Sequence, residues 1–380
     1  MHILYVLKSF PAGSGVDTVT RILGNELAEL GHDVHVCCFS YSKKSVFVNS
    51  KIKIYEFPEQ WDLADSGNNS LFLNQIITKN SIDIIINQEA DVIRICHLCN
   101  KARQGANTKL VSCSHFSLFT ELEAKGRILT RLFPKIIVKA KRMKTQLKLR
   151  NFVYDNSDIF VMLSSRFVEE YKKNMPEKNL SKLRSISETI NYDVQNIDFS
   201  KKTKNLLVVS RIAEEQKRIS LIIDIWKHLS KKYKDWSLII VGDGPDMEKS
   251  KKLAKNLQRI DFKGWQEPKS YYLNSPIFLM TSSYEGFGIT LIEAQNYGCV
   301  PVVMDSFSSL HDIIESGENG FIVPNNDKKA FIEKISLLID NCELREKMGK
   351  KAMDSSKEFD VGKIVKKWET LFAELTGKEF

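Results

Sequence analysis

Short, almost wholly apolar runs alternate with helical stretches along the whole chain, and this alternation restricts the fold more than any other feature of the sequence. Such runs are typical of parallel strands that helices cover on both faces. Five runs lie in the first half, at residues 2–7, 33–39, 82–87, 109–113 and 158–163. Five more lie at 205–209, 236–241, 259–262, 277–280 and 300–304. We therefore expect an α/β protein with two doubly wound parallel sheets.

A polar stretch without periodicity separates the two sets of runs. It spans residues 191–203, and we place an interdomain linker there. The chain has 380 residues, more than one hydrophobic core usually serves, so two domains are expected at 1–190 and 204–360. Residues 361–380 carry apolar side chains at helical spacing. This spacing predicts a C-terminal helix that packs on either domain, including back on the first.

Several classes of protein are disfavoured by composition. No apolar run reaches the 18 residues that suggest a membrane span, and the run at 3–7 is too short for a signal peptide. We therefore expect a cytoplasmic protein. The seven cysteines are odd in number and lie mostly in apolar segments, as free buried thiols do. Cys96 and Cys99 have the spacing that begins some zinc sites, but no second Cys or His pair follows.

A glycine turn follows the first apolar run. Gly13-Ser14-Gly15 precedes a helix whose Val19, Ile22, Leu23 and Leu27 share one side. A strand, a turn and a helix N-terminus can present backbone N–H groups to a phosphate, although the same residues also suit a plain tight turn. Thr18 occupies the third glycine position of the dinucleotide fingerprint, so binding of NAD is disfavoured.

The second half contains charged residues directly after two of its apolar runs. Arg211 and Lys217 follow the run at 205–209, where a diphosphate would need cations; the alternative is a solvated charged loop. Glu285 lies in a glycine-flanked turn after the run at 277–280, and we expect Glu293 two turns along the next helix. One carboxylate can then reach sugar hydroxyls, and the other can bind a ribose diol.

Together these motifs resemble those of the GT-B-fold retaining glycosyltransferases of family four, the glycogen-synthase-like hexosyltransferases. The resemblance covers essentially the whole chain, and its most specific motifs lie in the second half. They are the E-x7-E pair Glu285 and Glu293, Ser210-Arg211 with Lys217, and the segments 241–245, 298–303 and 317–323. The resemblance implies a GT-B fold, in which two Rossmann-like domains face each other across a cleft.

The resemblance also implies roles for individual residues. Arg211 and Lys217 would neutralise the donor diphosphate, and Glu293 would bind the ribose. Glu285 and His115 would lie near the transferred sugar, although a lone histidine after a strand is also often structural. The remaining implied donor-binding residues are Gly15, Phe262, Trp265, Phe287, Gly288, Ile289 and Thr290. Arg218 is an alternative to Lys217, because Arg211 and Lys217 are one residue further apart than in the commonest form of the motif.

No Asp-x-Asp triplet occurs in the chain, whereas glycosyltransferases of the other large fold use one to hold a divalent ion. We therefore expect no required metal or other cofactor. The resemblance implies a nucleotide diphosphate sugar as donor, with UDP the commonest carrier. It implies a glycan, lipopolysaccharide or lipid-linked acceptor, as in polysaccharide biosynthesis.

Residues 127–150 contain nine Lys or Arg and no Asp or Glu. Arg127, Arg131, Lys135 and Lys139 recur every four residues, and Arg142 follows. A helix of this kind can lie on an anionic membrane, so peripheral attachment to the inner face of the cell membrane is one expectation; a solvated basic face is the other. Pro134 interrupts the stripe.

Two rival functions remain from the sequence. The net charge of +9 suits a nucleic-acid-binding protein, but no aromatic interleaving, zinc finger or RNP-like motif accompanies the basic segment, so no nucleic-acid partner is expected. Another GT-B enzyme, such as a sugar-nucleotide epimerase or a phosphorylase, would keep the same fold with a different reaction.

Overall fold

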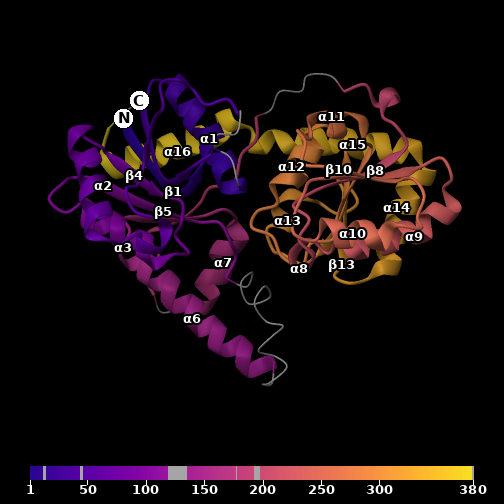
Figure 1. Ribbon diagram of the computed structural model, residues 1–380, viewed down its shortest axis with the longest axis horizontal. Helices are drawn as coiled ribbons and strands as arrows, with labels where there is room; N and C mark the ends of the chain where they lie inside the picture. Colours follow the sequence, from indigo (N-terminus) through magenta and orange to yellow (C-terminus); the bar gives the residue numbers. More distant parts are fainter. Residues whose placement is uncertain (12–13, 43–45, 119–134, 177, 192–196, 379–380) are drawn as a thin grey trace. The chain divides into compact units, whose positions relative to one another are not determined.

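The computed structural model describes residues 1–11, 14–42, 46–118, 135–176, 178–191 and 197–378, with only the backbone of 135–142. These residues form two compact units. The first contains β1 to β7 and, from the end of the chain, α16; the second contains β8 to α15. Figure 1 shows α16, in yellow, among the indigo and violet elements of the first unit.

The first unit is built on a parallel sheet whose described strands run in the order β3-β2-β1-β4-β5-β6-β7. Its strands are β1 (His2–Phe10), β2 (Asp33–Tyr41), β3 (Lys53–Glu56), β4 (Ile84–Asn87), β5 (Lys109–Ser114), β6 (Ile159–Met162) and β7 (Leu183–Ser185). Its helices are α1 (Gly15–Glu29), α2 (Gly67–Lys79), α3 (Ile93–Ala102), α6 (Lys135–Asp155), α7 (Ser165–Asn174) and α16 (Val361–Thr376). A short 3-10 turn, η1, spans Trp61–Leu63.

The helices of this unit follow the apolar pattern of the sequence. Val19, Ile22, Leu23 and Leu27 are the buried side of α1, as expected, and α1 packs against α16. The buried side of α16 contains Ile364, Val365, Trp368, Leu371 and Phe372. Backbone pairing between Ile190 and Asp360 fixes the start of α16 beside the segment that follows β7. On another part of the sheet, α2 and α3 cover Leu4 and Val6 of β1.

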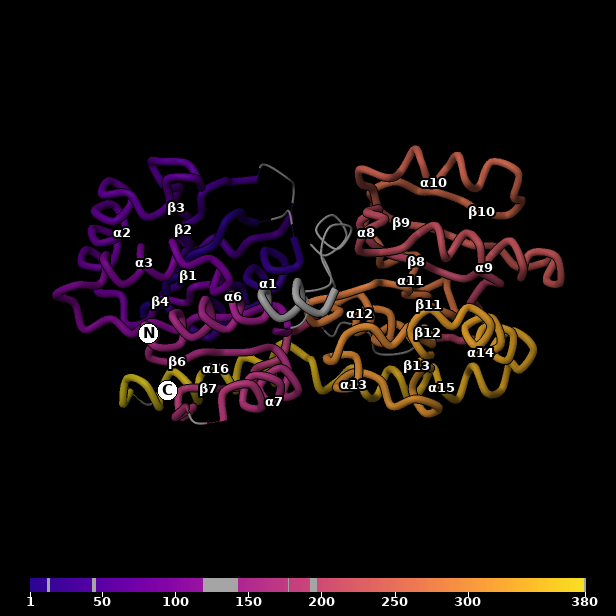
Figure 2. The backbone as a smooth tube through the Cα atoms, turned by 90° about the horizontal axis from the view of Figure 1, so that it is seen from below, coloured from indigo at the N-terminus to yellow at the C-terminus, as the bar shows by residue number. Residues whose placement is uncertain are grey.

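The second unit also has a parallel sheet, with its described strands in the order β10-β9-β8-β11-β12-β13. Figure 2 shows the labelled strands of each sheet in its spatial strand order from top to bottom. The strands are β8 (Asn205–Val209), β9 (Ser237–Val241), β10 (Ile260–Gly264), β11 (Ile277–Met280), β12 (Val300–Asp305) and β13 (Phe321–Pro324). The helices are α8 (Glu214–Lys217), α9 (Ile219–Lys232), α10 (Met247–Ala254), α11 (Lys269–Asn274), α12 (Ile289–Asn296), α13 (Leu310–Ile313), α14 (Lys328–Asp340) and α15 (Cys342–Ser356). Two 3-10 turns, η2 (Phe199–Lys201) and η3 (Lys357–Phe359), precede β8 and follow α15.

Part of the expected linker packs into this second unit. Phe199 lies against Gly298 and Gly349, where an added Cβ would meet its ring within 3.0 Å. The Nζ of Lys202 donates to the carbonyls of Ser275 and Tyr297, each at 2.8 Å, and to those of Tyr272 and Leu273. These carbonyls end α11 and α12, so a cation satisfies acceptors that a helix leaves unpaired at its C-terminus.

All ten strands expected from the apolar runs are present, and the described residues contain three more. β3 and β7 are edge strands of four and three residues that include exposed positions, and β13 is a four-residue edge strand ending in Pro324. Edge strands need not be continuously apolar, because one side of the ladder faces away from the sheet. No helix within the described ranges combines the length and apolar character needed to cross a membrane.

Candidate active site

The candidate site of the second unit lies at the carboxyl ends of β8 and β11. These neighbouring strands are where the strand order reverses, the place at which open α/β sheets usually bind ligands. The loops that follow them are joined directly: the Ser283 amide donates to the Gln216 carbonyl at 2.7 Å. The Thr281 hydroxyl donates to the Lys217 carbonyl at 3.1 Å. Two segments about 70 residues apart thus form one surface.

A buried ion pair connects the two loops. Lys217 Nζ lies 2.5 Å from Glu285 Oε1, and the two side chains are 14% and 9% exposed. The Ser282 hydroxyl donates to the same carboxylate oxygen at 2.5 Å, and Gln216 Nε2 donates to Oε2 at 3.4 Å. The structure therefore brings together Lys217 and Glu285. Sequence reasoning missed Ser282 and Gln216, whose only local signal is that they neighbour the two charged residues.

The other two cations of this region lie differently. Arg211 is exposed, and the described residues give its guanidinium no ion pair. Arg218 instead donates to the carbonyls of Thr281 and Ser282 and to the amide oxygens of Asn325 and Asn326. Arg218 thus connects the loop after β11, through Thr281 and Ser282, to the loop after β13, through Asn325 and Asn326. Because Arg218 is held by these contacts, Lys217 is favoured over Arg218 as the second cation, beside Arg211, of the expected diphosphate site.

The glycine turn after β9 explains the motif at residues 241–245. Gly242 has a φ of +131°, and an added Cβ would lie 1.8 Å from the Ser210 carbonyl oxygen. Only glycine permits so close an approach. The turn then holds the loop that carries Arg211, because the Ile212 amide donates to the Asp243 carbonyl at 2.9 Å.

The loop after β11 leads directly into α12. Gly288 is the N-cap, with a φ of +99°, and Phe287 is buried. Among the described residues, no hydrogen bond is recorded from the backbone amides of Gly288, Ile289 or Thr290. The first amides of a helix have no partner within it and attract anions. This helix start is therefore able to receive a phosphate group.

Glu293 lies one turn along α12, not two as the sequence suggested, because the helix begins only at Ile289. The glycine-flanked turn extends up to the N-cap and leaves less of the segment helical. Glu293 is half-buried, and the Tyr272 hydroxyl donates to its Oε2 at 2.9 Å. Burial raises the pKa of Glu293 to about 7. No local sequence signal identifies Tyr272, which lies 21 residues away.

The two aromatic residues expected near a nucleobase differ in burial. Phe262 is half-buried and packs against the core of the unit. Trp265 is 66% exposed and follows Gly264, the last residue of β10. Of the two, Trp265 offers a ring at the carboxyl edge of the sheet.

In the first unit, Gly15 is the first residue of α1. Ser14 caps this helix and forms a capping box with Asp17, whose carboxylate also accepts from the Ser9 hydroxyl at 2.8 Å. Gly15 is exposed, and an added Cβ would meet nothing within 4 Å. The carboxylate of Asp17 therefore already occupies part of the electropositive helix start.

His115 follows β5 and is buried in a polar network. Its Nδ1 lies 3.1 Å from Glu188 Oε1, and its Nε2 lies 2.9 Å from Gln88 Oε1. Burial by itself lowers the pKa of His115, but the hydrogen bond and charge of Glu188, with the charges of Asp91 and Glu89, raise it above its usual value. Two acceptor oxygens at the two ring nitrogens favour the imidazolium form. Sequence reasoning missed Gln88 and Glu188.

The basic segment falls largely outside the described residues. Arg127 and Arg131 lie in the undescribed part, and the side chains of Lys135, Lys139 and Arg142 do as well. α6 begins at Lys135, directly after Pro134. Arg150, the last residue of the basic segment, does not belong to a solvated face: it is 1% exposed and donates to the Phe116 carbonyl at 3.0 Å.

The cysteines are free in the described residues, six of them buried and Cys342 exposed. Burial raises the pKa of Cys96 to about 11 and also raises that of Cys99. Neither thiol therefore favours the thiolate that zinc requires.

Comparison with known proteins relates both units to sugar transfer. The family model of glycosyltransferase family 4 matches residues 13–191, and that of the group 1 glycosyl transferases matches residues 191–355. An uncharacterized glycosyltransferase of Haemophilus influenzae is 24% identical over 96% of this chain and 98% of its own length. A lipopolysaccharide 1,6-galactosyltransferase of Salmonella typhimurium is 36% identical over 30% of this chain and 33% of its own.

A solved structure of the Anabaena protein HepE in complex with UDP and glucose has the same fold. It covers 98% of this chain and 99% of its own, with a TM-score of 0.73 at 17% identity. The two parallel-sheet units, the two family models and this likeness agree. The chain belongs to the glycosyltransferases of family four and group 1, which have the GT-B fold.

Proposed function

We propose that this chain is a retaining hexosyltransferase that moves a sugar from UDP to a glycan, lipopolysaccharide or lipid-linked acceptor. The observation that carries the proposal is the joining of Lys217 to Glu285 where the strand order reverses, beside the open start of α12. Relatives that act on lipopolysaccharide, and a structural neighbour that binds UDP and glucose, support the choice of acceptor and donor.

Each group has a role suited to its place. Arg211 and Lys217 neutralise the diphosphate, and the amides of Gly288, Ile289 and Thr290 bind its oxygens. Glu293 accepts hydrogen bonds from the ribose hydroxyls, and Trp265 contacts the base. Glu285 holds sugar hydroxyls and stabilises the positive charge that develops at the anomeric carbon. From the first unit, Gly15 contacts phosphate and His115 lies near the sugar.

The reaction breaks the bond between the anomeric carbon and the phosphate oxygen and forms a bond from the acceptor oxygen to that carbon. The acceptor hydroxyl loses its proton to the departing phosphate, so the configuration is retained by attack from the same face. Preorganised cations at the leaving group supply the main electrostatic stabilisation. In this proposal two side-chain cations replace a divalent ion, and no metal is required.

An epimerase or a phosphorylase would use the same donor site. Products separate these activities, because an epimerase needs no acceptor and a phosphorylase needs inorganic phosphate. A transferase releases UDP only in proportion to the glycoside formed.

Nucleotide binding is the first experiment. We expect UDP or a UDP-sugar to raise the melting temperature of the chain, and GDP and ADP to raise it less. At 100 times the dissociation constant the stabilisation is about 2.7 kcal/mol. Glu293→Ala should lose this response, while Glu318→Ala, at an exposed position of the same unit, should keep it. A folded chain that responds to no nucleotide would contradict the proposal.

The acceptor proposal extends to the membrane surface. We expect the chain to sediment with vesicles that contain anionic lipid and to stay in solution with neutral vesicles, because the basic segment at 127–150 is attracted to negative headgroups. Replacing Lys135, Lys139 and Arg142 with Gln should abolish sedimentation. Replacing Lys227, Lys231 and Lys234, which lie at or just beyond α9, is the matched control. Equal loss in both variants would argue against a specific membrane face.

A further inference from the structure

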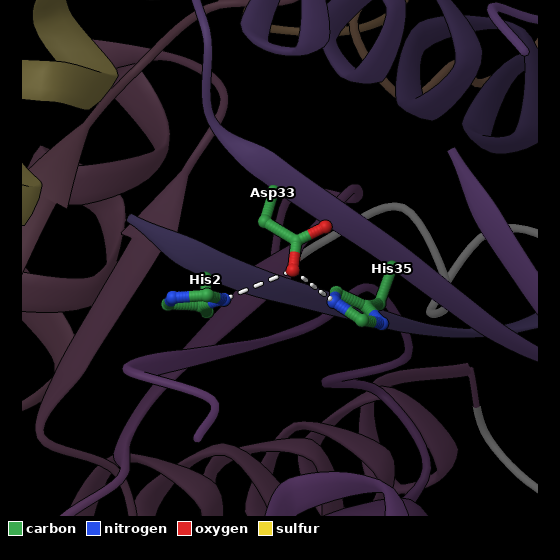
Figure 3. A group of neighbouring side chains, drawn as sticks. All are labelled: His2, Asp33 and His35. Carbon is green, nitrogen blue, oxygen red and sulfur yellow. Dashed lines mark hydrogen bonds and ion pairs between the residues drawn. The ribbon is translucent and has the colours of Figure 1, made fainter. Parts of the chain in front are cut away.

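Three side chains that can bind metal meet at the start of the first sheet. His2 begins β1, Asp33 begins β2, and the two residues are paired in register. His35 lies two residues after Asp33 and so projects from the same face of the sheet. Figure 3 shows both imidazole rings pointing toward one oxygen of the Asp33 carboxylate.

The spacing of these groups suits a single small cation. His2 Nδ1 and His35 Nε2 each lie 3.0 Å from Asp33 Oδ2, and the three ligand atoms lie within 4.8 Å of one another. Zinc binds imidazole nitrogen and carboxylate oxygen at about 2.0–2.2 Å in a tetrahedral arrangement, which separates its ligand atoms by about 3.3 Å. Small side-chain rotations are enough to reach this geometry.

His35 provides a second, independent observation. Its side chain is fully buried, yet its Nε2 has no well-directed hydrogen bond, although it lies 3.0 Å from the carboxylate. Its other ring nitrogen, Nδ1, lies 3.3 Å from the Tyr55 hydroxyl. Histidines that bind metal usually donate their second N–H to a neighbouring oxygen, which fixes the ring and its tautomer. Tyr55 stands where such a partner is needed.

Lys53 competes for the same carboxylate. Its Nζ lies 2.9 Å from Oδ1 and 3.0 Å from Oδ2 of Asp33. The side chain is 50% exposed and flexible, so it can leave Oδ2 and keep its contact with Oδ1. His2 is 45% exposed, which leaves one side of the cluster accessible to an ion and a water molecule.

We propose that His2, Asp33 and His35 form a Zn²⁺ site with an open fourth position, at which the ion joins the starts of β1 and β2. His115 follows the carboxyl end of β5 and therefore lies at the opposite edge of this parallel sheet. The ion therefore stabilises the first unit and takes no part in sugar transfer. The inference does not depend on the proposed function.

The test is a zinc titration of the full chain, purified without a histidine tag and freed of metal by a chelator. We expect one equivalent of Zn²⁺ to bind, to raise the melting temperature, and to be replaceable by Co²⁺ with the visible absorption of a tetrahedral site. His2→Ala and Asp33→Asn should each weaken binding by about tenfold or more, and Tyr55→Phe by about tenfold. Lys53→Met should strengthen binding, because it removes the competing cation.

His228→Ala is the matched control, since His228 is exposed on α9 in the other unit, and binding should not change. His2→Ala and Lys53→Met alter partly exposed side chains, so both should fold even if a change at buried His35 does not. Failure of both the natural chain and Lys53→Met to bind Zn²⁺ would overturn the inference. Stoichiometric binding that His2→Ala and Asp33→Asn leave unchanged would also overturn it.

Discussion

Lys217→Met is expected to destabilise the second unit by about 3 kcal/mol or more and to slow sugar transfer by at least about 100-fold. The Glu285 side chain is only 9% exposed, and the substitution removes the cation that lies 2.5 Å from its carboxylate. The donor diphosphate would lose one of its two proposed cations at the same time. Thermal unfolding and the rate of UDP release with an acceptor measure the two effects.

Glu285→Gln separates the two roles of this ion pair. The variant keeps the cation of Lys217 available to phosphate, so the melting-temperature response to UDP should persist while transfer falls. The double variant Lys217→Met/Glu285→Gln contains neither charge and should be more stable than Lys217→Met alone, without regaining the response to UDP.

Arg211→Met is the matched control for this pair, because Arg211 is an exposed cation on the same loop. It should weaken the UDP response with little change in the stability of the free chain. If Lys217→Met and Arg211→Met lower stability equally, or if Lys217→Met keeps full transfer, the assigned role of the ion pair is wrong.

Glu293→Gln should stabilise the chain at pH 8 and remove its response to UDP. Burial raises the pKa of Glu293 from 4.5 to about 7, so folding disfavours its ionised form. Below pH 4.5 the carboxyl group is protonated in both the folded and the unfolded state, so its burial does not lower the free energy of unfolding through ionisation. As the pH rises to 7 the unfolded chain ionises first, and above 7 the cost reaches about 3 kcal/mol.

The glutamine variant has no charge to bury and can still accept from the Tyr272 hydroxyl. Its melting temperature should therefore exceed that of the natural chain by several degrees at pH 8 and match it near pH 4.5. The loss of UDP response follows because an amide oxygen binds the ribose diol less strongly than a carboxylate. Such opposition between stability and binding is common at functional sites.

Glu318→Gln, an exposed change in the same unit, should show no pH-dependent difference from the natural chain. A stability gain for Glu293→Gln that is equal at pH 4.5 and pH 8 would show that ionisation is not its cause.

Much of the fold could be predicted from the amino-acid sequence. Strands covered on both faces were identifiable as continuous apolar runs, and the buried sides of α1 and α16 were identifiable because their apolar residues repeat at helical spacing. The motif spacing also indicated the residues of the second unit from Arg211 to Glu293. These features depend on near neighbours, so the chain alone is enough to find them.

Contacts between distant segments were decided only by the tertiary structure. Lys217 and Glu285 are 68 residues apart, and His115 is bound by Gln88 and Glu188, which lie 27 and 73 residues away. The order of the strands determines which loops meet, and a local pattern has no information on that order. The same reason explains why Arg150, one of nine basic residues in the segment 127–150, is buried and why Glu293 has a raised pKa. Burial and pKa depend on what surrounds a side chain in space.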